Sequence, residues 1–152
     1  MARVLLSAGV HLPRARLARS AIAAAHAWFN PNLPKGGERT HATWDEDSLT
    51  MAVEAVRACS NAAGNAAPAF GALRYASTTF PFADRSNAGL VAAALGREGL
   101  LQAQDVGGCL RAGTTALLSA FQSLADQDCP ATMVVASDTR QARPASPQEG
   151  QY

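Results

Sequence analysis

Short apolar runs alternate with segments of helical spacing through the second half of the chain, and this alternation constrains the fold more than any other feature. The strand-like runs are Ala72 to Ser77, Ala103 to Gly107 and Ala131 to Ser137. Ser86 to Leu95 and Thr114 to Leu124 lie between them and carry apolar residues at helical spacing. Strands that alternate with helices predict an α/β fold with a mostly parallel sheet covered by helices.

The first half of the chain follows this pattern less regularly. Val4 to Val10 is short and almost wholly apolar, so it predicts a further buried strand, and the Ala-rich segment Arg14 to Trp28 predicts a helix. Asn30 to Thr43 contains two prolines and two glycines, which predict an irregular surface loop. The next helical pattern follows three carboxylates that suit the cap of a helix N-terminus, Asp45, Glu46 and Asp47. We therefore expect a sheet of about four parallel strands.

The chain has 152 residues, the usual size of one domain. We expect one half-domain over residues 1–140, followed by a polar, Pro-rich tail over 141–152 that ends mid-fold. A parallel sheet without a closing strand leaves an edge whose backbone groups favour pairing with another segment. The expected fold is therefore incomplete without a second half, supplied by a longer polypeptide or by a partner chain.

Composition excludes several classes of protein. The chain is 48% hydrophobic and 16% charged with a formal charge of +1, so it lacks the broad positive field that nucleic acid requires. No apolar stretch approaches the roughly 20 residues that span a membrane. Its three cysteines are widely spaced and form no metal-ligand motif with histidines, which favours a reduced, cytoplasmic setting without a metal site.

The segment from Asp105 to Leu117 carries the candidate chemistry. A strand leads through Gly107 and Gly108 to Cys109 and then into a helix of small residues. The positive end of a helix favours a thiolate, and glycines allow a substrate carbonyl to approach backbone N–H groups. The residues alone leave two interpretations open, because a cysteine at such a junction is also a good small core residue.

Four blocks of sequence, in the same order, resemble the hydroxymethylglutaryl-CoA synthase and ketoacyl-ACP synthase III families. They are Trp44 to Arg57, Ala76 to Pro81 with Leu90 to Gly96, Asp105 to Leu117, and Val135 to Arg140 with Pro144 and Glu149. The resemblance implies the N-terminal half of a thiolase-type fold and carbon-carbon condensation of thioesters in lipid metabolism. It implies acyl-CoA or acyl-ACP as substrate, no further cofactor, and either a homodimer or a complementary C-terminal chain as partner.

The departures from the family pattern concern its reactive groups. Counted from Asp105 or from Gly113, the register of the family's nucleophilic cysteine falls on Leu110, and Cys109 stands one residue early. Thr78 stands where hydroxymethylglutaryl-CoA synthases carry their catalytic Glu, and a threonine cannot act as a carboxylic acid near neutral pH. The family's condensation histidine falls in its C-terminal half. Surface or packing roles are expected for the three histidines of this chain, His11, His26 and His41.

Three residues flank the Pro/Gly loop where relatives that this chain resembles meet the CoA nucleotide, namely Trp28, Lys35 and Arg39. An aromatic ring and two cations suit an adenine and its phosphates, whereas the alternative is a solvated loop without a ligand. Three hypotheses for function remain: an acyltransferase with Cys109 as its catalytic residue, a non-catalytic thiolase-fold scaffold or regulatory subunit, and a fragment. Leu110 and Thr78 favour the second, and we expect the chain alone to be incomplete or inactive.

Overall fold

The computed structural model describes residues 4–65, 68–99, 102–123, 130–143, 146 and 148. The chain divides into two compact units. Met1–His11 and Asp47–Asp138 form the first, here called the sheet unit, and Leu12–Glu46 with Thr139–Tyr152 forms the second, here called the small unit. The expected domain boundary at residue 140 stays a prediction.

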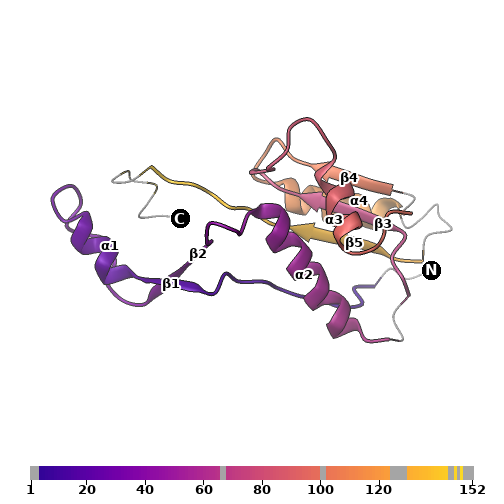
Figure 1. Cartoon of the computed structure of the whole chain (residues 1–152), viewed down its shortest axis with the longest axis horizontal. Coiled ribbons are helices and arrows are strands. Elements are labelled where there is room, and N and C mark those ends of the chain that lie inside the picture. The colour runs from indigo at the N-terminus through magenta and orange to yellow at the C-terminus, as the bar shows by residue number, and fades with distance from the viewer. Residues whose placement is uncertain are drawn as a thin grey trace. The chain divides into compact units, whose positions relative to one another are not determined.

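The sheet unit is built on three parallel strands (Figure 1). They are β3 (Ala72–Ala76), β4 (Gln102–Val106) and β5 (Thr132–Ala136), in the order β4-β3-β5. Ala76 lies in register with Val106 on one side and with Ala136 on the other, so the three strands end at the same level. The predicted parallel α/β sheet is confirmed, with all three strands within one or two residues of the expected ranges.

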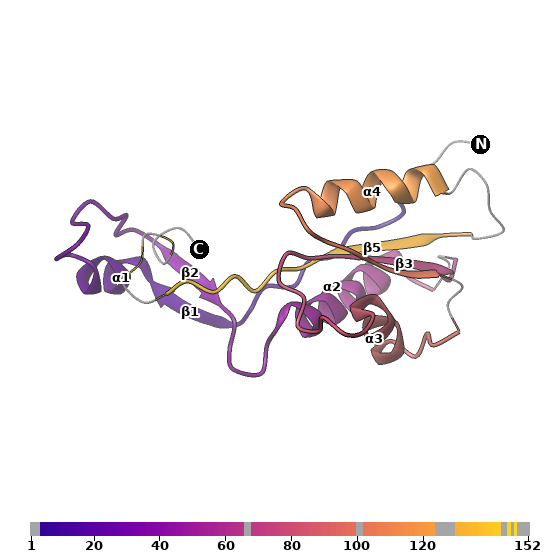
Figure 2. The ribbon, with the colours of Figure 1, turned by 90° about the horizontal axis from the view of Figure 1, so that it is seen from above.

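Helices cover both faces of this sheet. Helices α2 (Ser48–Ala63) and α3 (Asn87–Ala94) lie on one face, and α4 (Ala112–Ser123) lies on the other (Figure 2). Leu73 and Tyr75 of β3 are fully buried on the α2 and α3 side, in a cluster with Val56 and Val91. The α4 side is packed by the small residues Ala76, Ala112 and Ala116. Small side chains allow α4 to approach the sheet closely.

Both α2 and α3 begin at side-chain caps. The carboxylate of Asp47 accepts a 2.7 Å hydrogen bond from the backbone N–H of Thr50, whose hydroxyl accepts one from the N–H of Asp47, which is a reciprocal capping box. Of the three carboxylates expected to cap this helix, Asp47 is the one that does so. Ser86 caps α3 by accepting a bond from the N–H of Gly89.

Arg74 is a buried cation on the α4 side of the sheet, at 6% exposure. Its guanidinium donates to the side-chain oxygen of Gln104 on β4 and, over 2.9 Å, to the hydroxyl of Ser123 at the end of α4. The Nε of Arg74 has no hydrogen-bond partner. Arg74 therefore ties the C-terminal end of α4 to the sheet through polar contacts.

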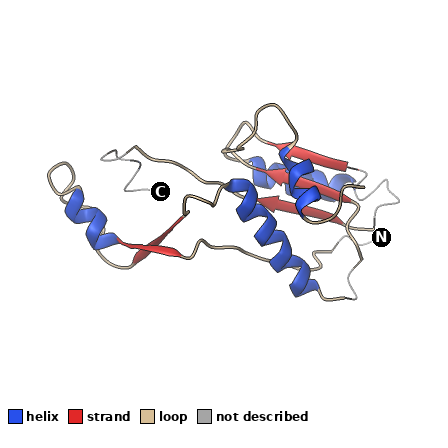
Figure 3. Ribbon diagram, in the orientation of Figure 1, coloured by secondary structure: helices blue, strands red, loops and turns tan. Residues whose placement is uncertain are grey.

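The small unit contains an antiparallel strand pair with a short helix between the strands (Figure 3). Its elements are β1 (Ala15–Ala18), α1 (Arg19–Ala25) and β2 (Glu38–His41). The helix predicted over residues 14–28 is therefore correct only for residues 19–25, because four earlier residues pair with β2 and the helix ends before His26. The surface loop predicted over residues 30–43 is correct except for the four residues of β2.

The buried strand predicted over residues 4–10 is also wrong. These residues belong to the sheet unit but form no strand, and Val4, Leu5, Leu6 and Val10 are 57–72% exposed. The segment is held against α2, where the hydroxyl of Ser7 donates a 2.7 Å hydrogen bond to the carbonyl of Cys59. The described part of the chain therefore has three parallel strands in place of the expected four.

No helix described here is long and apolar enough to span a bilayer.

Candidate functional site

The carboxyl ends of the three parallel strands meet at one edge of the sheet. The chain continues from them into Ser77–Phe80, Gly107–Leu110 and Ser137–Asp138. The N–H of Ser77 bonds to the carbonyl of Val106 over 3.1 Å, and the N–H of Ser137 bonds to the carbonyl of Ala76 over 3.1 Å. Loops at this edge of a parallel sheet are the usual location of a functional site in such folds.

Asp138 holds the loop that follows β3. One carboxylate oxygen, Oδ1, accepts from the N–H of Thr78 at 2.6 Å and from the Thr78 hydroxyl at 2.9 Å. The hydroxyls of Ser77 and Thr79 donate to the same oxygen over 3.0 and 3.2 Å. Partial burial tends to raise the pKa of Asp138, but the hydrogen bonds from Thr78, Ser77 and Thr79 outweigh it and lower the pKa below its ordinary value.

A second carboxylate near the same edge starts α3. Asp105 of β4 accepts from the N–H of Ala88 over 2.6 Å and from the N–H of Asn87 over 2.8 Å. Backbone N–H groups at the N-terminus of a helix have no partner within the helix, and a negative charge at this end stabilises it. Asp105 therefore acts as an additional cap and fixes the position of α3 against the strand that leads to Cys109.

Tyr75 is a residue of β3 close to this edge of the sheet. The side chain is fully buried and its ring packs edge-on against Phe80 at a centroid distance of 5.1 Å. Burial raises the pKa of Tyr75 to about 12, although the nearby hydroxyls of Ser48 and Ser77 act in the opposite direction. The phenol therefore stays protonated and neutral at any physiological pH.

The turn that carries Cys109 is shaped by two glycines. A Cβ at Gly107 would lie 2.8 Å from the Phe80 ring and 3.2 Å from the Ser77 carbonyl oxygen, so the two loops approach as only a glycine allows. Gly108 has φ +82°, a conformation that other residues rarely adopt. The junction of strand, glycine turn and helix predicted from the sequence is confirmed.

Cys109 and Leu110 lie in this turn, ahead of the helix. The carbonyl of Cys109 accepts a bond from the N–H of Ala112, the first residue of α4. Cys109 is an exposed free thiol and Leu110 is 80% exposed. Both side chains are therefore accessible from solvent at the carboxyl edge.

The other predicted site residues belong to the small unit. Trp28 follows α1, is 76% exposed and packs against the ring of Phe29 at a centroid distance of 5.7 Å. Lys35 lies in the loop before β2, and Arg39 is a half-buried residue of β2 opposite Leu17. Trp28, Lys35 and Arg39 thus share one unit, while Cys109 belongs to the other.

The sequence did not predict every contact at this edge of the sheet. Some of the positions that it did single out fall outside the described residues. The contacts of Asp138 and Asp105 were missed, although carboxylates near the carboxyl ends of two predicted strands indicate that both lie at the same edge of a parallel sheet. Pro144 and Glu149, which belong to the last of the four sequence blocks, lie outside the described residues. Within the described part of the chain, no three His, Cys, Asp or Glu residues gather as a metal site.

Solved structures share this architecture. The 3-oxoacyl-(acyl carrier protein) synthase III of Pseudomonas aeruginosa superposes with a TM-score of 0.78 at 24% identity, over 96% of this chain and 45% of that one. The corresponding synthase of Aquifex aeolicus gives a TM-score of 0.73 at 20% identity, over 88% of this chain and 44% of that one. The chain has a thiolase-like fold. It spans less than half the length of these structures.

Curated relatives agree with the thiolase-like assignment. The hydroxymethylglutaryl-CoA synthase of Aeropyrum pernix is 35% identical over 100 residues, 66% of this chain and 28% of that protein. The hydroxymethylglutaryl-CoA synthase of Methanopyrus kandleri is 30% identical over 144 residues, 93% of this chain and 41% of that protein. No family model matches the sequence. The resemblance to the synthase families is therefore confirmed over most of this thiolase-like chain, which spans less than half of the curated relatives.

Proposed function

We propose that this thiolase-like chain belongs to an acyltransferase that condenses acyl-CoA or acyl-ACP thioesters, and that alone it forms no acyl-enzyme. The observation that carries the proposal is the turn before α4. There an exposed cysteine and an exposed leucine follow a glycine pair at the carboxyl edge of the sheet. This geometry suits access of a thioester carbonyl to a side chain at the start of a helix.

The lack of an acyl-enzyme follows from the residue in the nucleophile register. Leu110 has no group that attacks a thioester. Cys109 precedes the first residue of α4 by three positions. It stands one residue before the register, and at a strand-helix junction a shift of one residue turns a side chain through a large angle.

The acyl donor would be recognised partly by the small unit. Trp28 offers an exposed ring, and Lys35 and Arg39 offer cations for the phosphates of a CoA nucleotide. The cytoplasm is the matching compartment, because Cys59 and Cys109 are free thiols in the described part of the chain.

Intact-mass measurement after incubation with acetyl-CoA tests the proposal. We expect no added acetyl group on the wild-type chain. The matched variant carries both Cys109→Ala and Leu110→Cys, which moves the thiol into the family register, and it should gain an acetyl group at residue 110. A wild-type adduct that maps to Cys109 by peptide sequencing would contradict the inactive assignment.

A non-catalytic scaffold or regulatory subunit is the second candidate, and the environment of Thr78 favours it. Both the N–H and the hydroxyl of Thr78 donate to Asp138, so this position serves to hold the loop. Calorimetric titration with CoA tests whether the ligand loop is retained, and both candidates predict binding that weakens in Trp28→Ala. Acyl transfer, measured after the chain is combined with the second half found in relatives, separates them: the acyltransferase predicts transfer and the scaffold predicts none.

A complementary C-terminal chain or a second copy is the proposed partner. Two neighbouring leucines of α4 are exposed, Leu117 at 41% and Leu118 at 55%. Exposed leucines in neighbouring positions of one helix favour coverage by another apolar surface. Co-expression with a chain that supplies the second half found in relatives should yield a stable complex, and Leu118→Glu should weaken it.

A further inference from the structure

The turn from Thr43 to Glu46 presents a tryptophan to solvent. Trp44 is 97% exposed, more than any other large hydrophobic side chain described. The Thr43 hydroxyl donates to Asp45 over 2.6 Å, and the Thr43 N–H donates to the carboxylate of Glu46 over 3.0 Å. The N–H of Glu46 in turn bonds to the Thr43 carbonyl over 3.1 Å. The backbone under the indole is therefore fixed while the ring contacts almost nothing.

Such a side chain is suited to insertion into a partner. A tryptophan buries roughly 150–250 Å² when it is covered, and a fixed backbone limits the entropy lost on binding. Tryptophan is enriched among the residues that dominate protein interfaces. Asp45 and Glu46 follow Trp44 directly and give the turn a negative charge, so the matching surface is an apolar hollow with cations at its rim.

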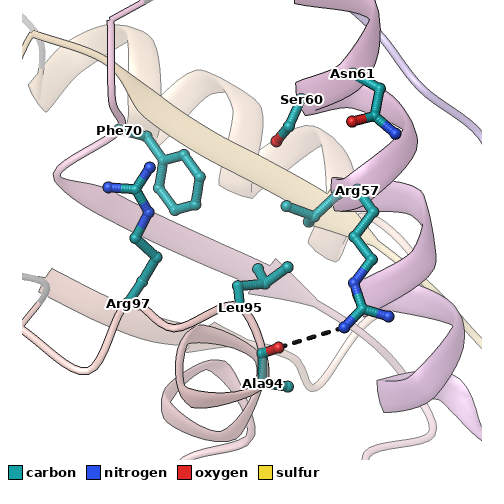
Figure 4. A pocket seen from close by; sticks show the side chains of 8 residues that line it. Arg57, Ser60, Asn61, Phe70, Ala94, Leu95 and Arg97 are labelled. Carbon is teal, nitrogen blue, oxygen red and sulfur yellow. Dashed lines mark hydrogen bonds between the residues drawn. The ribbon is translucent and has the colours of Figure 1, made fainter. Parts of the chain in front are cut away.

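The sheet unit carries a hollow of this kind. A pocket of about 300 Å³ lies between the C-terminal half of α2 and the end of α3. Its floor is formed by the buried Val56 and the half-buried Phe70 and Leu95. Arg57 and Arg97 stand on opposite sides of this floor (Figure 4). This volume is at the lower limit of small-molecule sites and suits one large side chain.

The rim of the pocket is largely preformed. Gly96, with φ +66°, turns the chain at the end of α3, and the N–H groups of Gly96 and Arg97 bond back to the carbonyls of Ala93 and Ala92. This motif fixes the backbone from which Arg97 extends. The Arg97 guanidinium lies 5.2 Å from the centroid of the Phe70 ring. Arg97 is therefore held beside the apolar floor.

Arg57 is the more adjustable cation of the rim. It pairs with Glu54 on the same helix, and the two side chains are 53% and 48% exposed. Its second nitrogen lies 3.5 Å from the carbonyl oxygen of Ala94 across the pocket. An exposed pair of this kind holds its partners weakly, so Arg57 can turn toward an incoming carboxylate.

We infer that Trp44 of one copy of the chain inserts into the pocket between α2 and α3 of a second copy, with its acidic neighbours beside Arg57 and Arg97. The tryptophan turn and the pocket are different surfaces, so the contact between two copies is heterologous. In such a dimer one copy still has an empty pocket and the other still has an exposed Trp44, so further copies can add. Self-association by this contact requires neither a thioester nor Cys109.

Sedimentation velocity on the full chain over a range of concentrations measures the association. The wild-type chain should form dimers and larger species, and Trp44→Ala should weaken association ~30-fold or more, the scale of a dominant interface residue. At concentrations where the wild type is monomeric, the two melting temperatures should agree, because the ring is almost fully exposed within one chain. Trp28→Ala, which also removes an exposed tryptophan of the small unit, is the matched control and should associate like the wild type.

Mixing two variants gives the sharper test. Trp44→Ala keeps the pocket, whereas Arg97→Glu keeps the tryptophan turn and places a repulsive charge in the pocket. Each variant alone should associate far more weakly than the wild type, and an equimolar mixture should form a heterodimer. Arg57→Glu serves as a second pocket variant if Arg97→Glu melts at a lower temperature. A monomeric wild-type chain, unchanged association of Trp44→Ala, or a mixture that stays monomeric would overturn the inference.

Discussion

Asp138 accepts a 2.6 Å hydrogen bond from the backbone N–H of Thr78, which lies 60 positions earlier in the chain. The bond joins the loop after the middle strand to the end of a neighbouring strand. Ser77 and Thr79 donate to the same carboxylate oxygen, so three consecutive residues share one acceptor. A single carboxylate oxygen therefore ties the loop after β3 to the residues that follow β5.

Replacement of Asp138 should loosen this edge. Asp138→Ala leaves the donors of Ser77, Thr78 and Thr79 without their acceptor, and we expect a loss of about 1–2 kcal/mol in the free energy of unfolding. Asp138→Asn retains one oxygen and should lose less. Urea denaturation of both variants measures the difference, and equal stability of Asp138→Ala and wild type would contradict the role assigned to Asp138.

The contribution of Asp138 should also depend on pH. Its pKa is lowered from the ordinary value of 3.8 in the folded chain, so the folded state favours the ionised form. The resulting stability is fully present above about pH 5, and it is lost as the pH falls through the folded pKa.

Comparison of wild type with Asp138→Asn isolates this effect. The difference in stability between them should be constant near neutral pH and should shrink below pH ~4. The pKa of Asp84 is also lowered, by its hydrogen bond to Arg85, but this carboxyl is fully exposed. Asp84→Asn is therefore the control, and it should follow the wild-type pH profile closely.

Gly107 should not tolerate a side chain. In Gly107→Ala the new methyl group meets the Phe80 ring at 2.8 Å and the Ser77 carbonyl oxygen at 3.2 Å, so the loop after β3 must move. We expect a loss of about 1–3 kcal/mol, typical of overpacking. Gly99→Ala is the matched control, because nothing lies within 4 Å of its added methyl group. Thermal melts of the two variants check this, and similar melting temperatures would refute the close approach.

Gly9 should be required for residues 4–10 to pack against the backbone of α2. A Cβ at this position would lie 2.7 Å from the backbone carbonyl carbon of Ala58, and a helix backbone cannot give way as a side chain can. In Gly9→Ala we expect the segment to lift from α2 and break the contact between Ser7 and Cys59.

Thiol labelling followed by peptide mapping measures this change. The half-buried Cys59 should react faster with a maleimide in Gly9→Ala than in wild type, whereas the exposed Cys109 should react at the same rate in both. Gly36→Ala, with no atom within 4 Å of the new methyl group, is the control. An unchanged rate at Cys59 would contradict the packing described for Gly9.

Local patterns accounted for most of the sheet unit. The strands and helices after residue 47 were predictable because their apolar spacing and caps act within a few residues, as Asp47 and Ser86 show. The apolar run at residues 4–10 was misread because its sequence fits a strand, but pairing requires a neighbour that the sequence cannot specify. β1 was missed for a related reason, since Ala-rich residues favour helix until pairing with β2 overrides them.

The candidate site was only partly predictable. The turn at Cys109 followed from its glycines and the helix after them. The partners of Asp138 and Asp105 lie on other strands and helices, so spacing along the chain could not reveal them. The assignment of Trp28, Lys35 and Arg39 to a CoA nucleotide stays a prediction.

The strand order has a consequence for synthesis of the protein. The middle strand β3 pairs with β4 on one side and with β5 on the other, and β5 is the last of the three to leave the ribosome. Asp138 emerges only after β5, so the loop after β3 gains its acceptor at the end of this sequence of events. A nascent chain that has just completed α4 therefore carries a half-paired middle strand, and premature release at that stage would expose it to aggregation.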